Sequence, residues 1–330
     1  MNSVEEVNWL VIVNLHAGSR RCERDWPEIK ELLDKSGLKT TIEFTQESHQ
    51  AIDIVQKNIE EKGFKKIIIV GGDGTMNEVV NGVFRQKRFK TTEITLGLIT
   101  VGTGNDWARH YGMHDEYIKM IDTIKNGKTF IQDVGKVNYN HIDKKEDRYF
   151  VNIAGMGFDA LVAKKTNLSK QKGRGGLLIY LFNLLQGLFQ FSHTKLSVIG
   201  DDKTVFEGNV FSMSIGICKY NGGGMMQLPF AISDDGLFDV TIIKKTSKFT
   251  VIKNIKNLYD GSFVNMDEVE TYTGKKFIIK ANPPKTLFLE TDGESLGHSP
   301  LFFEIVPKSI KLIVRQKFLK ADEKKKLFKD

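Results

Sequence analysis

The feature that most constrains this sequence is an alternation of short apolar runs with amphipathic stretches, which ends near residue 133. Apolar runs at 9–13, 66–70 and 94–100 have the length and composition of strands buried on both faces. The stretches 25–36 and 48–59 carry apolar residues at helical spacing, and a glycine follows each of them. This succession predicts an α/β domain with a doubly wound parallel sheet and helices on both of its faces.

The second half of the chain has a different pattern. Its apolar runs are short, rich in β-branched and aromatic residues, and separated by turns, while only 177–191 and 248–258 have helical spacing. The runs are 149–153, 196–199, 210–217, 238–243, 276–279, 286–289 and 302–306. They predict an antiparallel sandwich or barrel, and of the two we expect a β-sandwich. We therefore expect an α/β domain at 1–133, a β-sandwich domain at 134–306, and a basic C-terminal segment at 307–330 that packs back on the first domain.

Composition excludes several classes of protein. The chain has 330 residues, of which 40% are hydrophobic, so it has enough apolar mass for a core and is not disordered. Two cysteines are too few for a disulfide scaffold and fit a reducing compartment. No apolar run reaches the roughly 20 residues that cross a bilayer as a helix. We expect a cytoplasmic protein rather than an integral membrane protein.

The net charge of +7 is unevenly spread. Residues 315–330 contain seven Lys or Arg and three Asp or Glu, which makes +4, and residues 160–200 contain basic residues but no acidic ones. A basic stretch suits nucleic acid, an anionic membrane or a phosphate-rich ligand, and charge alone does not choose among them. No nucleic-acid reader motif accompanies the charge, so we expect no nucleic-acid partner.

Two glycine-rich loops each follow a predicted strand and precede a predicted helix. The first is Gly-Gly-Asp-Gly-Thr at 71–75, and the second is Gly-Thr-Gly-Asn-Asp at 102–106. Glycines let a backbone approach a ligand closely, and a helix N-terminus offers free N–H groups to phosphate oxygens. Asp73 would suit Mg²⁺ or a hydroxyl beside those phosphates. Neither loop has the spacing of a dinucleotide or P-loop motif, so the pair predicts a phosphate site of another kind.

Six motifs in order carry a family resemblance. They are N-x-x-A-G at 14–18, G-G-D-G-T-x-N-E at 71–78, G-T-G-N-D at 102–106, G-x-G-F-D-A at 155–160, D-D-G-L-F-D-V at 234–240 and D-G-E at 292–294. Over about residues 8–306 the chain closely resembles the diacylglycerol kinase catalytic-domain family, the bacterial soluble lipid kinases related to sphingoid-base kinases. The resemblance implies that the first domain has the NAD-kinase and phosphofructokinase-like fold and binds ATP.

The resemblance also implies roles for individual residues. Glu294 matches the general base for the lipid hydroxyl, and Asp73, Asp106 and Asp133 match acidic residues that organise Mg²⁺ and water around the phosphates. The positions that match nucleotide contacts are Asn14, Thr45, Gly71, Gly72, Asp73, Gly74, Thr75, Met76, Asn77 and Thr103. The positions that match a structural Mg²⁺ site are Asp235 through its side chain and Ile232 and Leu237 through their carbonyls. Arg24 and Lys172 match basic residues near the site.

The first motif departs from the family pattern. The family usually has proline where this chain has Leu15, and a basic residue where it has Ser19. Gly18 is kept, so we expect the loop to form with altered phosphate contacts.

The stretch 177–191 has leucines at helical spacing, and basic residues flank it. A basic amphipathic helix of this kind suits an anionic membrane surface. A core helix packed on the second domain explains the same pattern and is the reading that we favour, and one helix can combine both roles. We expect a peripheral membrane protein that takes its substrate from lipid, and we leave a homodimer open.

The sequence favours an ATP- and Mg²⁺-dependent lipid kinase that converts diacylglycerol to phosphatidic acid, an activity of phospholipid biosynthesis. Other lipid acceptors remain open, namely a sphingoid base or phosphatidylglycerol. Two further alternatives are an NAD kinase, whose family shares the first glycine loop, and a catalytically silent lipid- or nucleotide-binding regulator at the membrane surface. Retention of Asp73, Asp106, Asp235 and Glu294 argues against the silent regulator, because a binder needs no base.

Overall fold

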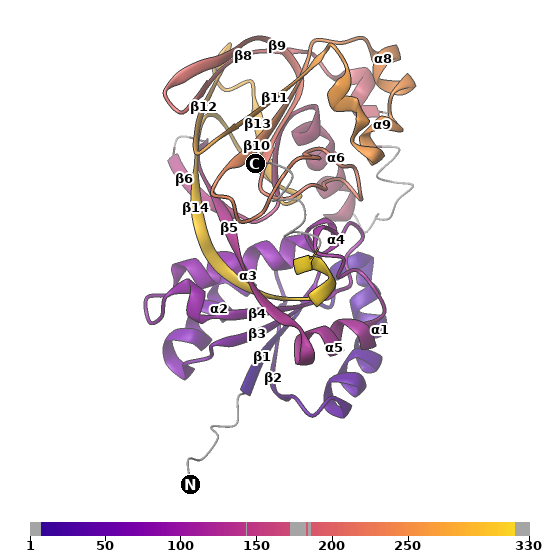
Figure 1. Ribbon diagram of the computed structural model, residues 1–330, viewed down its shortest axis with the longest axis vertical. Helices are drawn as coiled ribbons and strands as arrows, with labels where there is room; N and C mark the ends of the chain where they lie inside the picture. The colour runs from indigo at the N-terminus through magenta and orange to yellow at the C-terminus, as the bar shows by residue number, and fades with distance from the viewer. Residues whose placement is uncertain (1–7, 143, 172–182, 184–185, 321–330) are drawn as a thin grey trace. The chain divides into compact units, whose positions relative to one another are not determined.

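The computed structural model describes residues 8–142, 144–171, 183 and 186–320 (Figure 1). The chain divides into two compact units, Met1–Gln132 with Lys308–Asp330 (unit 1) and Asp133–Pro307 (unit 2). It passes from unit 1 to unit 2 within β5 (Lys128–His141) and returns within β14 (Glu294–Val314). No helix in the described part of the chain has the length and apolar character needed to cross a membrane.

Unit 1 is an α/β unit with a parallel sheet in the order β2, β1, β3, β4, followed by the C-terminal part of β14. Its strands are β1 (Asn8–Val13), β2 (Lys39–Phe44), β3 (Lys66–Gly71) and β4 (Thr95–Thr100). Its helices are α1 (Ala17–Lys35), α2 (Gln50–Lys62), α3 (Asp73–Arg85), η1 (Thr91–Glu93), α4 (Asp106–His110) and α5 (Tyr117–Asn126). Because the strands are parallel, the loops that follow them meet at one edge of the sheet.

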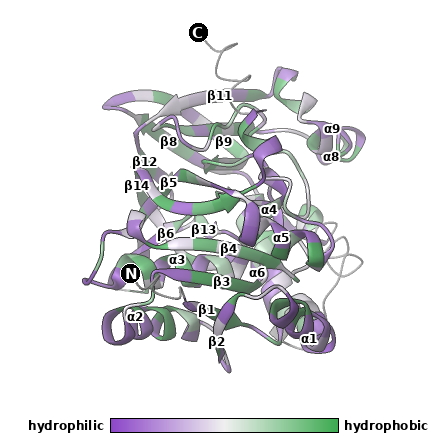
Figure 2. Cartoon of the chain, turned by 60° about the horizontal axis from the view of Figure 1, so that its bottom comes forward, coloured by the Kyte–Doolittle hydropathy of each residue, from purple (hydrophilic) through white to green (hydrophobic). Residues whose placement is uncertain are grey.

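Both faces of the unit 1 sheet are covered. On one face, Val11 of β1 and Ile68 of β3 pack in a cluster with Ile29 of α1 and Met120 of α5. On the other face, α2 and α3 lie against each other, and Leu10 of β1 is fully buried as well. Figure 2 shows β3 and β4 as largely hydrophobic strands. The predicted doubly wound α/β fold is therefore confirmed.

Unit 2 is built on antiparallel strands. They are β6 (Lys144–Phe150), β7 (Ile153–Gly157), β8 (Thr194–Gly200), β9 (Lys203–Gly216), β10 (Phe238–Lys244), β11 (Val269–Gly274), β12 (Lys276–Asn282), β13 (Phe288–Thr291) and the remainder of β5 and β14. The pairs β9–β7, β7–β13, β13–β14, β14–β12, β12–β8 and β8–β9 close a circuit around one apolar core. The antiparallel second domain is confirmed.

The helices of unit 2 differ in part from the prediction. They are α6 (Phe158–Gln171), α8 (Lys248–Lys253), α9 (Asn257–Asp260) and η2 (Ser262–Asn265). The expected helix at 248–258 is therefore two short helices, separated at 254–256. Most of 177–191 lies outside the described residues, although 186–190 is helical and its Leu188 is buried.

The C-terminal residues that the structure describes belong to unit 1. Lys311 and Leu312 pair with β4 in parallel register, and the Arg315 guanidinium donates to the Thr123 hydroxyl at 3.1 Å. The Phe318 ring lies edge-on to Tyr111, with ring centroids 4.8 Å apart. This part of the predicted basic segment thus contributes a strand to the sheet of unit 1, and residues 316–320 after it are helical.

Candidate functional site

The two glycine loops of unit 1 touch through their backbones. A Cβ on Gly102 would lie 2.6 Å from the Gly72 Cα, and a Cβ on Gly72 would lie 3.1 Å from the Gly102 Cα. Gly72 is the N-cap of α3, which begins at Asp73. The two loops can therefore approach this closely only because Gly72 and Gly102 lack side chains, and the N-terminus of α3 lies beside the second loop.

Asp73 joins the first loop to the helix that follows the second. Its carboxylate accepts the backbone N–H groups of Asp106 and Trp107, both at 3.2 Å, and so caps the start of α4. A Cβ on Gly104 would lie 3.2 Å from an Asp73 carboxylate oxygen and 3.1 Å from an Asp106 oxygen. The structure therefore brings oxygens of two of the predicted magnesium-organising carboxylates close to one point beside Gly104.

The end of β1 contributes Asn14, which lies against the first loop. Its amide donates to the Thr75 hydroxyl at 2.9 Å, and its carbonyl oxygen accepts the His16 N–H at 3.1 Å. Gly18 has a φ of 63°, and a Cβ there would lie 2.2 Å from the Val101 carbonyl oxygen. The loop therefore forms despite Leu15, and its path across the end of β4 requires glycine.

The remaining predicted nucleotide residues lie at different depths. Thr103 is exposed, and Thr45 is buried at the end of β2, where its N–H donates to the Val13 carbonyl at 2.9 Å. Met76 and Asn77 are fully buried in α3. Their side chains therefore belong to the interior of unit 1, and residues 72–74 are the partly exposed part of this loop.

Glu78 is a structural residue that the sequence reasoning did not assign. It is buried, and its carboxylate accepts the N–H groups of His49 at 2.9 Å and Ala51 at 3.2 Å at the start of α2. Its place in the G-G-D-G-T-x-N-E motif was the available signal. The G-G-D-G-T-x-N-E motif thus supplies carboxylates that hold the N-termini of two other helices, α2 and α4.

Of the two basic residues that the resemblance assigned to the site, the structure describes Arg24 but not Lys172. The Arg24 guanidinium donates to Asp25 at 2.8 Å, and with further bonds from Tyr117 and Arg21 it lowers the pKa of Asp25 to about 2. Lys172 lies outside the described residues.

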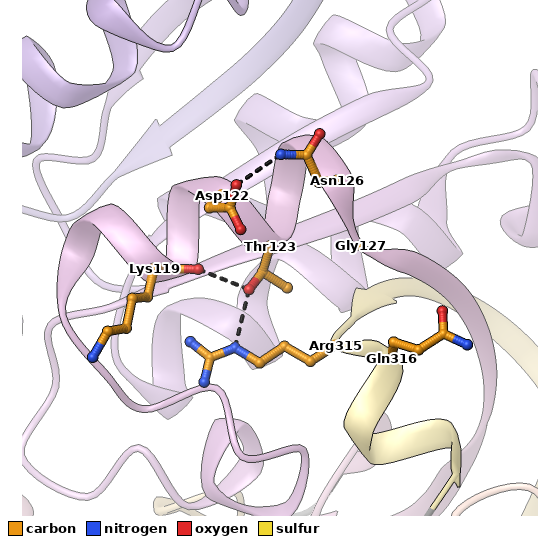
Figure 3. Close-up of a pocket in the computed structure, with 7 residues that line it drawn as sticks. All are labelled: Lys119, Asp122, Thr123, Asn126, Gly127, Arg315 and Gln316. Atoms are coloured by element: carbon orange, nitrogen blue, oxygen red, sulfur yellow. Dashed lines mark hydrogen bonds between the residues drawn. The ribbon is translucent and has the colours of Figure 1, made fainter.

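A pocket of about 300 Å³ in unit 1 lies elsewhere, between α5 and the residues that follow β14 (Figure 3). It is lined by Lys119, Asp122, Thr123, Asn126, Gly127, Arg315 and Gln316. None of these residues belongs to the glycine loops, so this pocket is not part of the candidate site.

In unit 2, the D-G-E motif forms the tight turn between β13 and β14. Asp292 and Gly293 have φ values of 50° and 85°, which are the signs of a two-residue hairpin turn, and Thr291 pairs with Glu294. The buried Asp292 carboxylate accepts the N–H groups of Val151 at 2.9 Å, Asn152 at 3.0 Å and Ile153 at 3.2 Å. The turn is therefore anchored to the start of β7, and Glu294 follows it directly.

Arg148 holds the Glu294 carboxylate. Its guanidinium donates to Glu294 at 2.5 Å, and the side chains of Arg148 and Glu294 are 10% and 19% exposed. A guanidinium orients a carboxylate firmly in such a sheltered place. Arg148 belongs to no motif of the sequence and is 146 residues away, so sequence reasoning missed it.

A second, buried carboxylate also accepts hydrogen bonds at this turn. Glu290 is 1% exposed, and it accepts the Gly293 N–H and the Asn221 amide, both at 2.9 Å. Burial raises the pKa of Glu290 to about 8. Glu290 lies two residues before the D-G-E motif, which was the only signal for it.

Asp159, the aspartate of the G-x-G-F-D-A motif, belongs to the same polar network. It is half-buried at the start of α6 and accepts the Ser214 hydroxyl and the Gln227 amide, both at 3.2 Å. Burial raises the pKa of Asp159 to about 6. A Cβ on Gly155 would lie 2.5 Å from a Glu290 oxygen and 2.9 Å from the Asp159 Cβ, so the glycine of this motif makes room for both acids.

Asp133 lies with the predicted metal loop. It is fully buried, its carboxylate accepts the Gly236 N–H at 2.7 Å, and its own N–H donates to the Ser233 carbonyl at 2.8 Å. Asp133 belongs to unit 2, whereas Asp73 and Asp106 belong to unit 1. Its described contacts therefore support the 233–236 turn.

The residues of the predicted metal loop have donors that fit Mg²⁺. Asp235 is exposed, and its carboxylate also accepts the Leu237 N–H at 3.1 Å. Ile232 is buried and Leu237 is half-buried on either side of it, and Gly236 turns the chain with a φ of 76°. An exposed carboxylate beside backbone carbonyls is a set of hard oxygen ligands.

Comparisons with known proteins agree with this architecture. Residues 8–137 match the family model of the diacylglycerol kinase catalytic domain, and residues 152–314 match that of the YegS C-terminal NAD kinase beta sandwich-like domain. A solved structure of a putative diacylglycerol kinase from Bacillus anthracis is similar in fold, with a TM-score of 0.73 and 22% identity over 96% of this chain and 99% of that one.

Curated relatives extend over most of the chain. A diacylglycerol kinase of Bacillus subtilis is 30% identical over 88% of this chain and 90% of its own length. The putative lipid kinase YtlR of the same organism is 27% identical over 92% of this chain and 99% of its own. This chain therefore belongs to the family of diacylglycerol kinase-like lipid kinases.

Proposed function

We propose that the protein transfers the γ-phosphoryl group of ATP to the hydroxyl of diacylglycerol and forms phosphatidic acid. The observation that supports this most is the anchored D-G-E turn, which presents Glu294 beside Arg148 in a family of lipid kinases. We further propose that the protein acts at the membrane surface from the cytoplasm, because its lipid substrate resides there.

The glycine loops of unit 1 would hold the nucleotide. Backbone N–H groups at the start of α3 suit phosphate oxygens, and the glycines at 71, 72 and 102 keep side chains out of their way. Thr75, fixed by Asn14 at 2.9 Å, and the exposed Thr103 add hydroxyls at the same edge of the sheet. These groups bind and orient the donor, which is most of what phosphoryl transfer requires.

The two carboxylates that approach one point beside Gly104 suit Mg²⁺, which would neutralise the charge on the phosphates when bound. Asp73 and Asp106 would hold it in unit 1, while Asp235 with the carbonyls of Ile232 and Leu237 would hold a structural ion in unit 2.

Glu294 would act as the general base. The lipid hydroxyl oxygen forms a bond to the γ-phosphorus, the bond from that phosphorus to the β–γ bridging oxygen breaks, and ADP leaves with that oxygen. The hydroxyl proton passes to the Glu294 carboxylate. Arg148 positions this carboxylate, so its contribution is orientation rather than proton transfer.

The test is transfer of labelled γ-phosphate from ATP with Mg²⁺ to mixed micelles that contain diacylglycerol, sphingosine, ceramide or phosphatidylglycerol. NAD is included as a soluble acceptor. Glu294→Gln should lower kcat about 10²- to 10⁴-fold, as expected for loss of a general base. Glu304→Gln is the matched control, because Glu304 lies on the same strand and is exposed.

The outcomes separate the alternatives. The proposal is supported if wild-type protein labels diacylglycerol and the Glu294→Gln variant does not. Label on sphingosine or phosphatidylglycerol in its place would reassign the acceptor, and label on NAD alone would restore the NAD kinase alternative. Wild-type turnover by Glu294→Gln would remove Glu294 from the mechanism.

A further inference from the structure

Unit 2 carries an exposed surface of aromatic, aliphatic and basic side chains that the proposed chemistry does not use. We call it the α8 surface and define it by Phe189, Lys248, Phe249, Ile252, Lys253 and Lys256. Figure 1 shows α8 and α9, in orange, side by side at the edge of this unit.

The short helix α8 has one buried face and one exposed apolar face. Val251 and, just past the helix, Ile255 pack on the cluster that contains Phe158 and Phe211. Phe249 and Ile252 point away from that cluster and are 76% and 45% exposed. Packing therefore explains the inward residues but gives no reason for two large apolar side chains in solvent.

Phe189 extends this exposed face. It is 65% exposed, although the preceding Leu188 is buried in the same cluster as Val251. The Lys248 ammonium donates to the Phe189 carbonyl at 2.7 Å and lies 5.6 Å from the centroid of the Phe189 ring. The ring of Phe189 is thus next to the start of α8, and a lysine lies beside it.

The charge around these apolar residues is positive. Residues 244–256 contain five lysines and no acidic residue. Lys244 pairs with Glu270 at 3.0 Å, but Lys253 and Lys256 are exposed and have no carboxylate partner among the described residues. The next acidic residue along the chain is Asp260, whose carboxylate accepts the Ser262 N–H at 2.9 Å.

We propose that the α8 surface docks the protein on an anionic lipid bilayer. Phe189, Phe249 and Ile252 enter the headgroup region, while the lysines bind anionic headgroups. A second copy of the chain is a poor occupant, because a two-fold contact through this surface would bring lysines against lysines. The inference rests on the proposed function only in that the lipid acceptor resides in such a bilayer.

The experiment measures sedimentation with vesicles in the absence of ATP. Wild-type protein should bind vesicles made of phosphatidylcholine with roughly 30 mol% phosphatidylglycerol. It should bind vesicles of pure phosphatidylcholine much more weakly. Phe249→Ser with Ile252→Ser should lower the association constant about tenfold or more. The matched control is Ile118→Ser with Phe302→Ser, which removes two exposed apolar side chains elsewhere.

Charge is tested separately. The test variant is Lys253→Glu with Lys256→Glu, and its control is Lys57→Glu with Lys87→Glu. All four lysines are exposed. Each substitution lowers the net charge by two, so both double variants change it from +7 to +3. Only the α8 pair should weaken vesicle binding by about tenfold, and added salt should abolish that difference.

Equal loss in both lysine pairs, or full binding by the Phe249 and Ile252 variant, would overturn the proposal. The proposal would also be overturned if wild-type protein is a dimer in analytical ultracentrifugation and the Phe249 and Ile252 variant is a monomer. Phosphate transfer in detergent micelles tests the proposed function on its own. A protein that binds vesicles through α8 but transfers no phosphate would refute only the proposed function.

Discussion

Two Asp-Gly pairs, one in each unit, perform similar structural tasks in different surroundings. Asp73 is half-buried and accepts two N–H groups at the start of α4, whereas Asp292 is buried and accepts three at 151–153. Both carboxylates fasten one loop to another. The difference indicates that Asp292 is committed to structure, whereas the half-buried Asp73 remains accessible for the role in Mg²⁺ binding that we propose.

The largest expected effect concerns Asp292. Asp292→Ala should lower the free energy of unfolding by about 3–5 kcal/mol, because three buried N–H groups lose a charged acceptor. Urea denaturation followed by tryptophan fluorescence and by circular dichroism measures it. Asp267→Ala, at an exposed site, should change stability by less than about 0.5 kcal/mol. If Asp292→Ala lowers the free energy of unfolding by less than about 1 kcal/mol, Asp292 is not the structural anchor that its comparison with Asp73 implies.

The second prediction concerns pH and the carboxylate beneath the D-G-E turn. Burial raises the pKa of Glu290 from 4.5 to about 8, so between these values the folded protein binds more protons than the unfolded chain. Stability should therefore fall as pH rises through this window, by up to about 1.4 kcal/mol per pH unit. Asp159, with its pKa raised to about 6, adds a fall of the same sign at lower pH.

Glu290→Gln isolates this effect. The variant should lose the part of the slope that lies above pH 6, and Glu304→Gln, at an exposed site, should keep the whole slope. Thermal unfolding at pH 5.5, 6.5, 7.5 and 8.5 measures both variants. If the stability of wild-type protein instead rises across this pH range relative to that of Glu290→Gln, the raised pKa of Glu290 is contradicted.

The third prediction compares the glycines of the two motifs. Gly102→Ala places a methyl 2.6 Å from the Gly72 backbone, so it should cost about 1–3 kcal/mol and weaken ATP binding. Gly293→Ala meets open space, and its cost of about 1–2 kcal/mol comes from the φ of 85° alone. Calorimetric titration with ATP should show weakened binding for Gly102→Ala. An equal loss in both variants would mean that the loop contact does not shape the nucleotide site.

The smallest expected effect on stability concerns Asp73. Asp73→Asn leaves an acceptor for one of the two N–H groups, so unfolding should become easier by only about 1 kcal/mol. Under the proposed function, kcat should nevertheless fall by at least about tenfold, because the carboxylate also organises Mg²⁺. Asp53→Asn, at an exposed position of α2, is the control for both measurements. An unchanged kcat would place Asp73 with Asp292 as purely structural.

Local patterns were enough to predict the elements that carry the site. The apolar run at 66–70 and the glycines that follow it predicted β3 and the start of a helix, because strand burial and backbone freedom are properties of neighbouring residues. The helix begins at Asp73 instead of at 76, since Gly72 takes the extended N-cap conformation. The helix predicted at 248–258 breaks at 254–256, which apolar spacing alone did not reveal.

Contacts between distant residues were beyond such patterns. Arg148 meets Glu294 because β6 and the D-G-E turn come together in unit 2, and Asp133 meets Gly236 across 103 residues. The burial that raises the pKa of Glu290 likewise depends on β7 and Asn221 covering it. Nothing near these residues in the chain specifies their partners.

By itself, the sequence determined the two-part architecture, the glycine loops and the family, because periodicity and motif order are written along the chain. Only the tertiary structure decided which carboxylates serve as anchors and which remain accessible for chemistry. The physical reason is that an aspartate in a loop can accept N–H groups from any loop that the fold brings within about 3 Å. Asp292 accepts the N–H groups of residues 151–153 and Asp73 accepts those of residues 106 and 107, and these partners depend on how the strands pair rather than on either motif.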